Sequence, residues 1–122
     1  MSKTATAIPK AKMSYGALLG RIVEHRRSQL RIHQEAIAQA LGVSQSAYSR
    51  LEKGQSAMSV TQLRIVAERL RTTPSDLLKH ADQYATQLRA QGVEITDEKS
   101  DSTAGVMLAL AILAALIAAG SS

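Results

Sequence analysis

The residues best suited to chemistry in this chain lie close together, in the segment SQSAYSRLEKG from Ser44 to Gly54. Gln45 carries an amide that can pair with adenine, and Arg50 carries a guanidinium that can address the two acceptors of guanine. Arg50 could equally be a solvated cation on an exposed face. Ser44 is a suitable helix N-cap and Gly54 a suitable stop, so the segment predicts a short helix with a polar face.

A second short helix precedes this one. The sequence HQEAIAQALG predicts a helix that begins at Gln34 and ends at Gly42, a glycine suited to the left-handed turn that closes helices. Two short helices joined by LGVS form a helix-turn-helix pattern. In that pattern the second helix can enter the major groove of DNA.

Three further helices are predicted around this pair. Apolar residues recur at helical spacing over residues 15–30, which predicts an amphipathic first helix. Ser59 is the predicted cap of a fourth helix, and Thr73 followed by Pro74 is a strong start signal for a fifth. Together these signals predict an all-α domain of five helices over residues 15–91.

The two ends of the chain differ from this domain in composition. Residues 1–14 are small, polar and lysine-bearing, which predicts a disordered basic arm. Residues 92–103 are acidic and rich in hydroxyl groups, which is typical of a linker. Residues 104–120 carry no charge and predict an apolar helix.

Three interpretations of residues 104–120 stay open. A helix of this length would extend about 25 Å, a little less than the hydrocarbon core of a bilayer at about 30 Å. The segment lacks the polar side that a helix in water normally keeps, which favours a membrane anchor surrounded by lipid. The first alternative is an oligomerisation helix in a soluble assembly, and the second is a disordered tail.

Charge and composition restrict the possible partners. The net charge is +5, and residues 1–91 carry 14 basic against 6 acidic residues, a net +8. This excess favours a polyanion such as nucleic acid or an anionic membrane surface. The chain has no cysteine, and His25, His33 and His80 are not at metal-ligand spacing. The sequence therefore predicts neither an enzyme nor a metal or cofactor site.

From Arg26 to about Leu78 the chain resembles the phage-repressor-like (XRE) helix-turn-helix family, through QEAIAQALGVSQSAYSRLEKG, LRIVAERL and TPSDLL. The resemblance implies a five-helix lambda-repressor-like fold that binds double-stranded DNA. The residues that it implies as base-contacting are Gln45, Ser46, Ser49 and Arg50. Those that it implies as phosphate-contacting are Gln34, Lys53 and Gly54. It also implies a structural ion pair between Arg27 and Glu52.

The leading hypothesis is a sequence-specific DNA-binding transcriptional regulator, a homodimer or higher oligomer whose cytoplasmic domain is held at the bacterial inner membrane by residues 104–120. A second hypothesis is a membrane-linked scaffold protein that uses the same domain to dock a protein partner. A third is a soluble DNA-binding oligomer assembled through the C-terminal helix, and a fourth is the antitoxin of a two-gene pair.

Overall fold

The structure, a computed structural model, describes residues 9–100 and 102–120. Its helices are α1 (Tyr15–Gln29), α2 (Gln34–Leu41), α3 (Gln45–Glu52), α4 (Val60–Arg69), α5 (Pro74–Ala90) and α6 (Thr103–Gly120). Two short strands are added to them, β1 (Lys12–Ser14) and β2 (Glu94–Thr96). The predicted fold, five helices followed by an apolar helix, is confirmed, and the two strands were not predicted.

Local sequence signals set the helix boundaries. The side chains of Ser44, Ser59 and Thr73 each accept a hydrogen bond from a backbone N–H in the first turn of the helix that follows. Such a bond satisfies one of the donors that a helix N-terminus leaves free. Gly42 ends α2 at a φ of 71° and Gly54 follows α3 at 73°. Both adopt the left-handed conformation expected of glycine at these positions.

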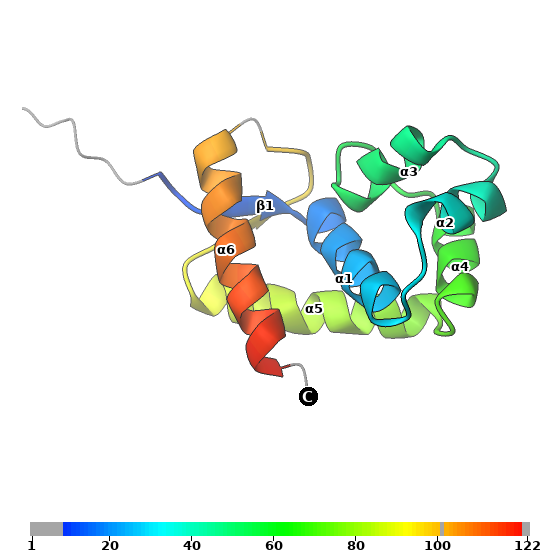
Figure 1. The fold of residues 1–122 in the computed structure, drawn as a ribbon. Helices are drawn as coiled ribbons and strands as arrows, with labels where there is room; N and C mark the ends of the chain where they lie inside the picture. Colours follow the sequence, from blue (N-terminus) through cyan, green and yellow to red (C-terminus); the bar gives the residue numbers. More distant parts are fainter. Residues whose placement is uncertain (1–8, 101, 121–122) are drawn as a thin grey trace, which may run out of the picture.

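The helices pack around one aliphatic core. In Figure 1, α2, α3 and α4 lie on one side of α1, and α6 with β1 lies on the other, while α5 runs beneath both groups. The core includes fully buried residues from every one of these helices: Leu18, Val23, Ile37, Tyr48, Val66, Leu70, Leu77, Leu88 and Ala109. The candidate site on α2 and α3 is therefore held by the same core that α6 helps to cover.

The predictions for the chain ends need correction. Residues 12–14 do not belong to a disordered arm, because they form β1, which pairs in parallel with β2 in the register Met13 to Ile95. The segment 92–103 is not simply a linker, since it contains β2 and the buried Val93. Met13 is fully buried, so burial of apolar side chains accounts for the order of both segments. Residues 1–8 of the predicted arm lie outside the described residues.

Helix α6 packs on its own chain, a placement that the sequence did not predict. Gly105, Ala109 and Leu113 are spaced four residues apart and form the buried face of α6, which contacts β1 and α5. A Cβ atom added at Gly105 would overlap the carbonyl oxygen of Lys10, so the helix needs glycine there to approach the segment that leads into β1. The opposite face leaves Met107 61% and Leu108 39% exposed.

A second close approach joins α1 to the end of α3. A Cβ atom added at Gly20 would overlap the carbonyl oxygen of Glu52 and lie 2.6 Å from its carbon. These are backbone atoms, which cannot rotate away as a side chain could. Gly20 therefore sets the distance between α1 and α3.

Gly20→Ala should lower the free energy of unfolding by roughly 1–3 kcal/mol, because the added methyl group forces the two helices apart. Gly16→Ala on the same helix is the matched control, since the nearest atom to its added Cβ is Ser14 Oγ at 4.0 Å. Alanine favours helix formation, so the control should be neutral or stabilising by up to about 1 kcal/mol. Urea unfolding measures both variants, and equal stability of the two would contradict the close approach.

Candidate nucleic-acid interface

Helices α2 and α3 are joined by a tight turn. Gly42 donates its backbone N–H to the carbonyl oxygens of α2, and Val43 donates to Ala38 O at 3.0 Å. Ser44 then accepts a hydrogen bond from Ala47 N at 3.1 Å. Only three residues separate the two helices, so the chain changes direction within a single turn and α3 begins at Gln45.

Helix α3 has one buried and one exposed face. Tyr48, Leu51 and Glu52 are buried in the domain. The polar residues implied as base-contacting lie on the other side, where Gln45, Ser46 and Arg50 are exposed and Ser49 is half-buried. The side chain of Lys53 is exposed beyond the end of the helix, followed by the half-buried Gly54. The structure therefore brings these residues to one surface.

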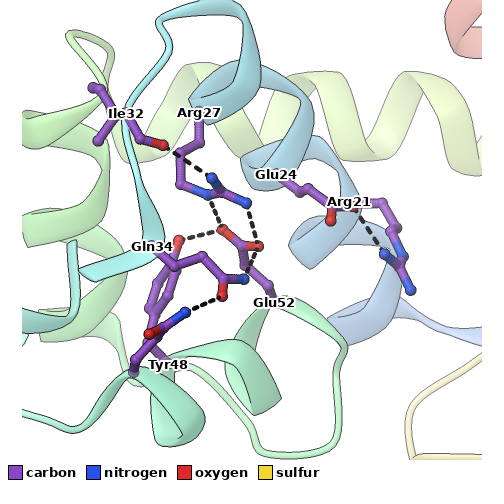
Figure 2. A network of polar contacts seen from close by, with 8 residues as sticks. Arg21, Glu24, Arg27, Ile32, Gln34, Tyr48 and Glu52 are labelled. Carbon is purple, nitrogen blue, oxygen red and sulfur yellow. Dashed lines mark hydrogen bonds and ion pairs between the residues drawn. The ribbon is translucent and has the colours of Figure 1, made fainter. Parts of the chain in front are cut away.

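The buried face of α3 ends in a carboxylate with four hydrogen bonds (Figure 2). Glu52 is 1% exposed and accepts from Arg27 Nε at 2.7 Å and from Arg27 Nη2 at 3.1 Å, a bidentate pair. It also accepts from Tyr48 Oη at 2.6 Å and from Gln34 Nε2 at 3.0 Å. Arg27 and Glu52, the implied ion pair, thus join α1 to α3, and Gln34 adds α2 to the network.

The charged groups of this network are mostly buried. Burial alone would raise the pKa of Glu52, but the hydrogen bonds from Arg27, Tyr48 and Gln34 lower it below the ordinary value. Burial and the bond to Glu52 raise the pKa of the Tyr48 hydroxyl, which therefore stays protonated as a donor. At neutral pH the network consists of a carboxylate, a guanidinium and two neutral donors, which satisfies the buried charge.

Gln34 links this network to the exposed face of α3. Its Nε2 donates to Glu52, and its Oε1 accepts a longer hydrogen bond of 3.5 Å from Gln45 Nε2. Because an ionised carboxylate only accepts, the amide of Gln34 must present its nitrogen to Glu52 and its oxygen to Gln45. The buried carboxylate thereby orients the first residue of the exposed face.

Comparisons with known proteins agree with this geometry. A helix-turn-helix family model matches residues 22–77, which include α2, the turn and α3. Residues 22–77 form a domain of this helix-turn-helix family. Similar solved structures include two crystal structures of the clp gene regulator ClgR from Corynebacterium glutamicum, both 26% identical to this chain. A search of curated proteins gave no match.

The two ClgR structures each cover more than half of this chain. One has a TM-score of 0.60 and covers 63% of this chain and 82% of the ClgR chain. The other has a TM-score of 0.54 and covers 57% of this chain and 91% of the ClgR chain. In both comparisons the match covers more residues than the 56 of the family model, which run from 22 to 77.

Two residues of the helix-turn-helix domain have roles that the sequence analysis missed. The hydroxyl of Tyr48 donates to Glu52, and the i, i+4 spacing of the two residues on one helix face is the signal that could have shown it. Arg26 donates to Leu70 O and Arg71 O, both at 2.9 Å, at the end of α4. These bonds satisfy carbonyl groups that a helix C-terminus leaves free, and no local pattern predicts them.

Glu52→Gln should lower the free energy of unfolding by roughly 3–5 kcal/mol at neutral pH, because it leaves the partly buried Arg27 without its counter-charge. Glu24→Gln is the matched control, since the Arg21–Glu24 pair is 27% and 38% exposed and should contribute only about 0–1 kcal/mol. Chemical denaturation at several pH values measures the free energy of unfolding of the wild type, Glu52→Gln and Glu24→Gln.

The loss caused by Glu52→Gln should also depend on pH. Because folding lowers the pKa of Glu52, its contribution is complete above the ordinary value of 4.5 and is lost as the carboxylate becomes protonated below it. The stability difference between wild type and Glu52→Gln should therefore shrink as the pH falls through this range. A difference that stayed constant to about pH 3 would mean that folding does not lower the pKa of Glu52.

Proposed function

We propose that this protein is a sequence-specific DNA-binding transcriptional regulator that places α3 in the major groove. The observation that carries the proposal is the division of α3 into a face fixed by the Glu52 network and an exposed polar face. A recognition helix needs both features, because base readout depends on side chains held in position. The likeness to ClgR, described as a clp gene regulator, supports a role in transcription.

The exposed residues divide into two groups by their chemistry. Arg50 can donate two hydrogen bonds to guanine and Gln45 can pair with adenine, while Ser46 and Ser49 can bond to either kind of base pair. For the sugar-phosphate backbone we propose contacts from Gln34 at the start of α2 and from Lys53 and Gly54 after α3. The second amide hydrogen of Gln34 and the free backbone N–H groups at the α2 N-terminus suit a phosphate.

We further propose that the protein binds DNA as a homodimer. Dimers of helix-turn-helix proteins read two half-sites that are related by the symmetry of the protein. The exposed face of α6, with Met107 and Leu108, is a surface through which copies of the chain could associate.

Arg50→Ala and Gln45→Ala should each weaken binding to the preferred duplex by about 1–3 kcal/mol and leave binding to random DNA nearly unchanged, because base contacts specify and phosphate contacts position. Arg64→Ala, which removes an exposed arginine from α4, is the control for lost charge. A preferred site is first selected from a random duplex pool. Titrations at two salt concentrations then measure the affinity of each variant for that site and for random DNA.

Two results would contradict the proposed function. Equal losses on preferred and random DNA would reject base contacts by Arg50 and Gln45. A full-length protein that bound no duplex at low salt would favour the alternative of a scaffold that docks a protein partner, since the basic domain should displace counterions from any DNA.

A second candidate concerns where the regulator acts, and we propose that α6 attaches it to the membrane. Over its 18 residues α6 has a mean hydropathy of 2.3 and only 17% of them are buried, unlike the core helix of a globular domain. Its length of about 27 Å is close to a bilayer core of about 30 Å. To insert, α6 would have to leave β1 and α5.

Ala111→Lys tests membrane attachment, because it places a charge on the exposed face near the middle of α6 and spares the buried face. A lysine there should oppose insertion by about 2.5–3.5 kcal/mol. Wild type and the matched control Ala111→Leu should then pellet with membranes and resist alkali, and Ala111→Lys should move to the supernatant. Wild type that stayed in the supernatant as a defined oligomer would contradict attachment and favour assembly through α6.

A further inference from the structure

A groove of about 610 Å³ runs between α1 and α6. In Figure 1, α6 and α2 lie on opposite sides of α1. Its α1 wall is polar and consists of Arg21, Glu24, His25 and Ser28, which recur at helical spacing. Its α6 wall is apolar and consists of Leu110, Leu113, Ala114, Ile117 and Ala118. A concave site with one apolar side and a few polar groups is the usual form of a small-molecule site.

Arg21 has an unusual place in the polar wall. Its Nη1 donates to Glu24 Oε1 at 2.8 Å, and its side chain is 27% exposed. Its Nε is buried and has no hydrogen-bond partner among residues 9–100 and 102–120. Buried donors in native proteins almost always have an acceptor, so this position calls for one from outside the described chain.

The same domain shows what kind of acceptor fits. Arg27 binds the Glu52 carboxylate through Nε and Nη2, the two nitrogens on one edge of its guanidinium. In Arg21, Glu24 takes Nη1, and the corresponding Nε–Nη2 edge makes no hydrogen bond to the described residues. Two parallel donors match the two oxygens of a carboxylate.

We propose that this groove binds an amphipathic carboxylate, with its head on the Nε–Nη2 edge of Arg21 and its aliphatic chain along α6. From Leu110 to Ala118 the apolar wall extends about 12 Å at 1.5 Å per residue, which suits a chain of about 8 to 10 carbons. The ligand contacts α1 and α6 together, so its binding stabilises α6 in the docked position. This inference does not depend on DNA binding, and either can fail without the other.

Decanoate is the probe, titrated by calorimetry into the purified full-length protein below its micellar concentration, with decanol and acetate as comparison ligands. Decanoate should bind with one molecule per chain, at least tenfold more tightly than decanol, and should raise the melting temperature of the protein. Acetate, which lacks the chain, should not bind. No binding of decanoate, or equal affinity for decanol, would overturn the proposal.

Variants separate the groove from the exposed face of α6. Arg21→Gln should weaken decanoate binding to the level of decanol, and Arg64→Gln should not change it. Ala114→Phe fills the groove and should abolish binding, while Ala115→Phe, exposed on the same helix outside the groove lining, should leave it intact. Circular dichroism verifies that each variant is folded. Equal losses in the Ala114 and Ala115 variants would show nonspecific binding to α6 and overturn the proposal.

Discussion

A buried carboxylate at the end of α3 is the constraint on which the helix-turn-helix domain depends. Glu52 has almost no contact with solvent, so its charge is tolerated only because Arg27, Tyr48 and Gln34 all donate to it. Those donors come from three different helices. Any movement of α1, α2 or α3 relative to the others would break at least one hydrogen bond to the buried carboxylate, which makes the network a strong determinant of their arrangement.

Because of this constraint, the residues of α3 that stabilise the domain and the residues proposed to recognise DNA lie on different faces of the helix. The residues packed into the domain, Tyr48 and Glu52, lie on one face of α3, and the residues proposed to contact DNA lie on the other. Gly20 completes the arrangement, since it lets the backbone of α1 lie directly against the end of α3. The exposed side chains could therefore change, and with them the proposed base contacts, without disturbing the support beneath them.

Local signals predicted the helices and the exposed face of α3. Among the long-range contacts, the Arg27–Glu52 ion pair was expected from the family resemblance, and the others were not predicted. Ser44 and Gly42 act through hydrogen bonds within a few residues, so their effect can be read from the segment itself. The pairing of Met13 with Ile95 joins segments about 80 residues apart, and three-residue strands carry too little alternation to reveal it. The role of Arg26 at the end of α4 is equally invisible, because an arginine's partner is set by tertiary packing.

Helix α6 shows why composition alone does not identify the neighbour of an apolar segment. Lipid, a second copy of the chain and the protein's own core all favour the same aliphatic residues. The docked position depends instead on the shape of one face, where Gly105 and Ala109 are small enough for the helix to lie against β1. Small residues at this spacing also suit close packing of helices in a bilayer, so the same face cannot serve both contacts at once. Docking on β1 and insertion into lipid are therefore mutually exclusive, and the stability of the β1 contact sets the free energy that any competing environment of α6 must exceed.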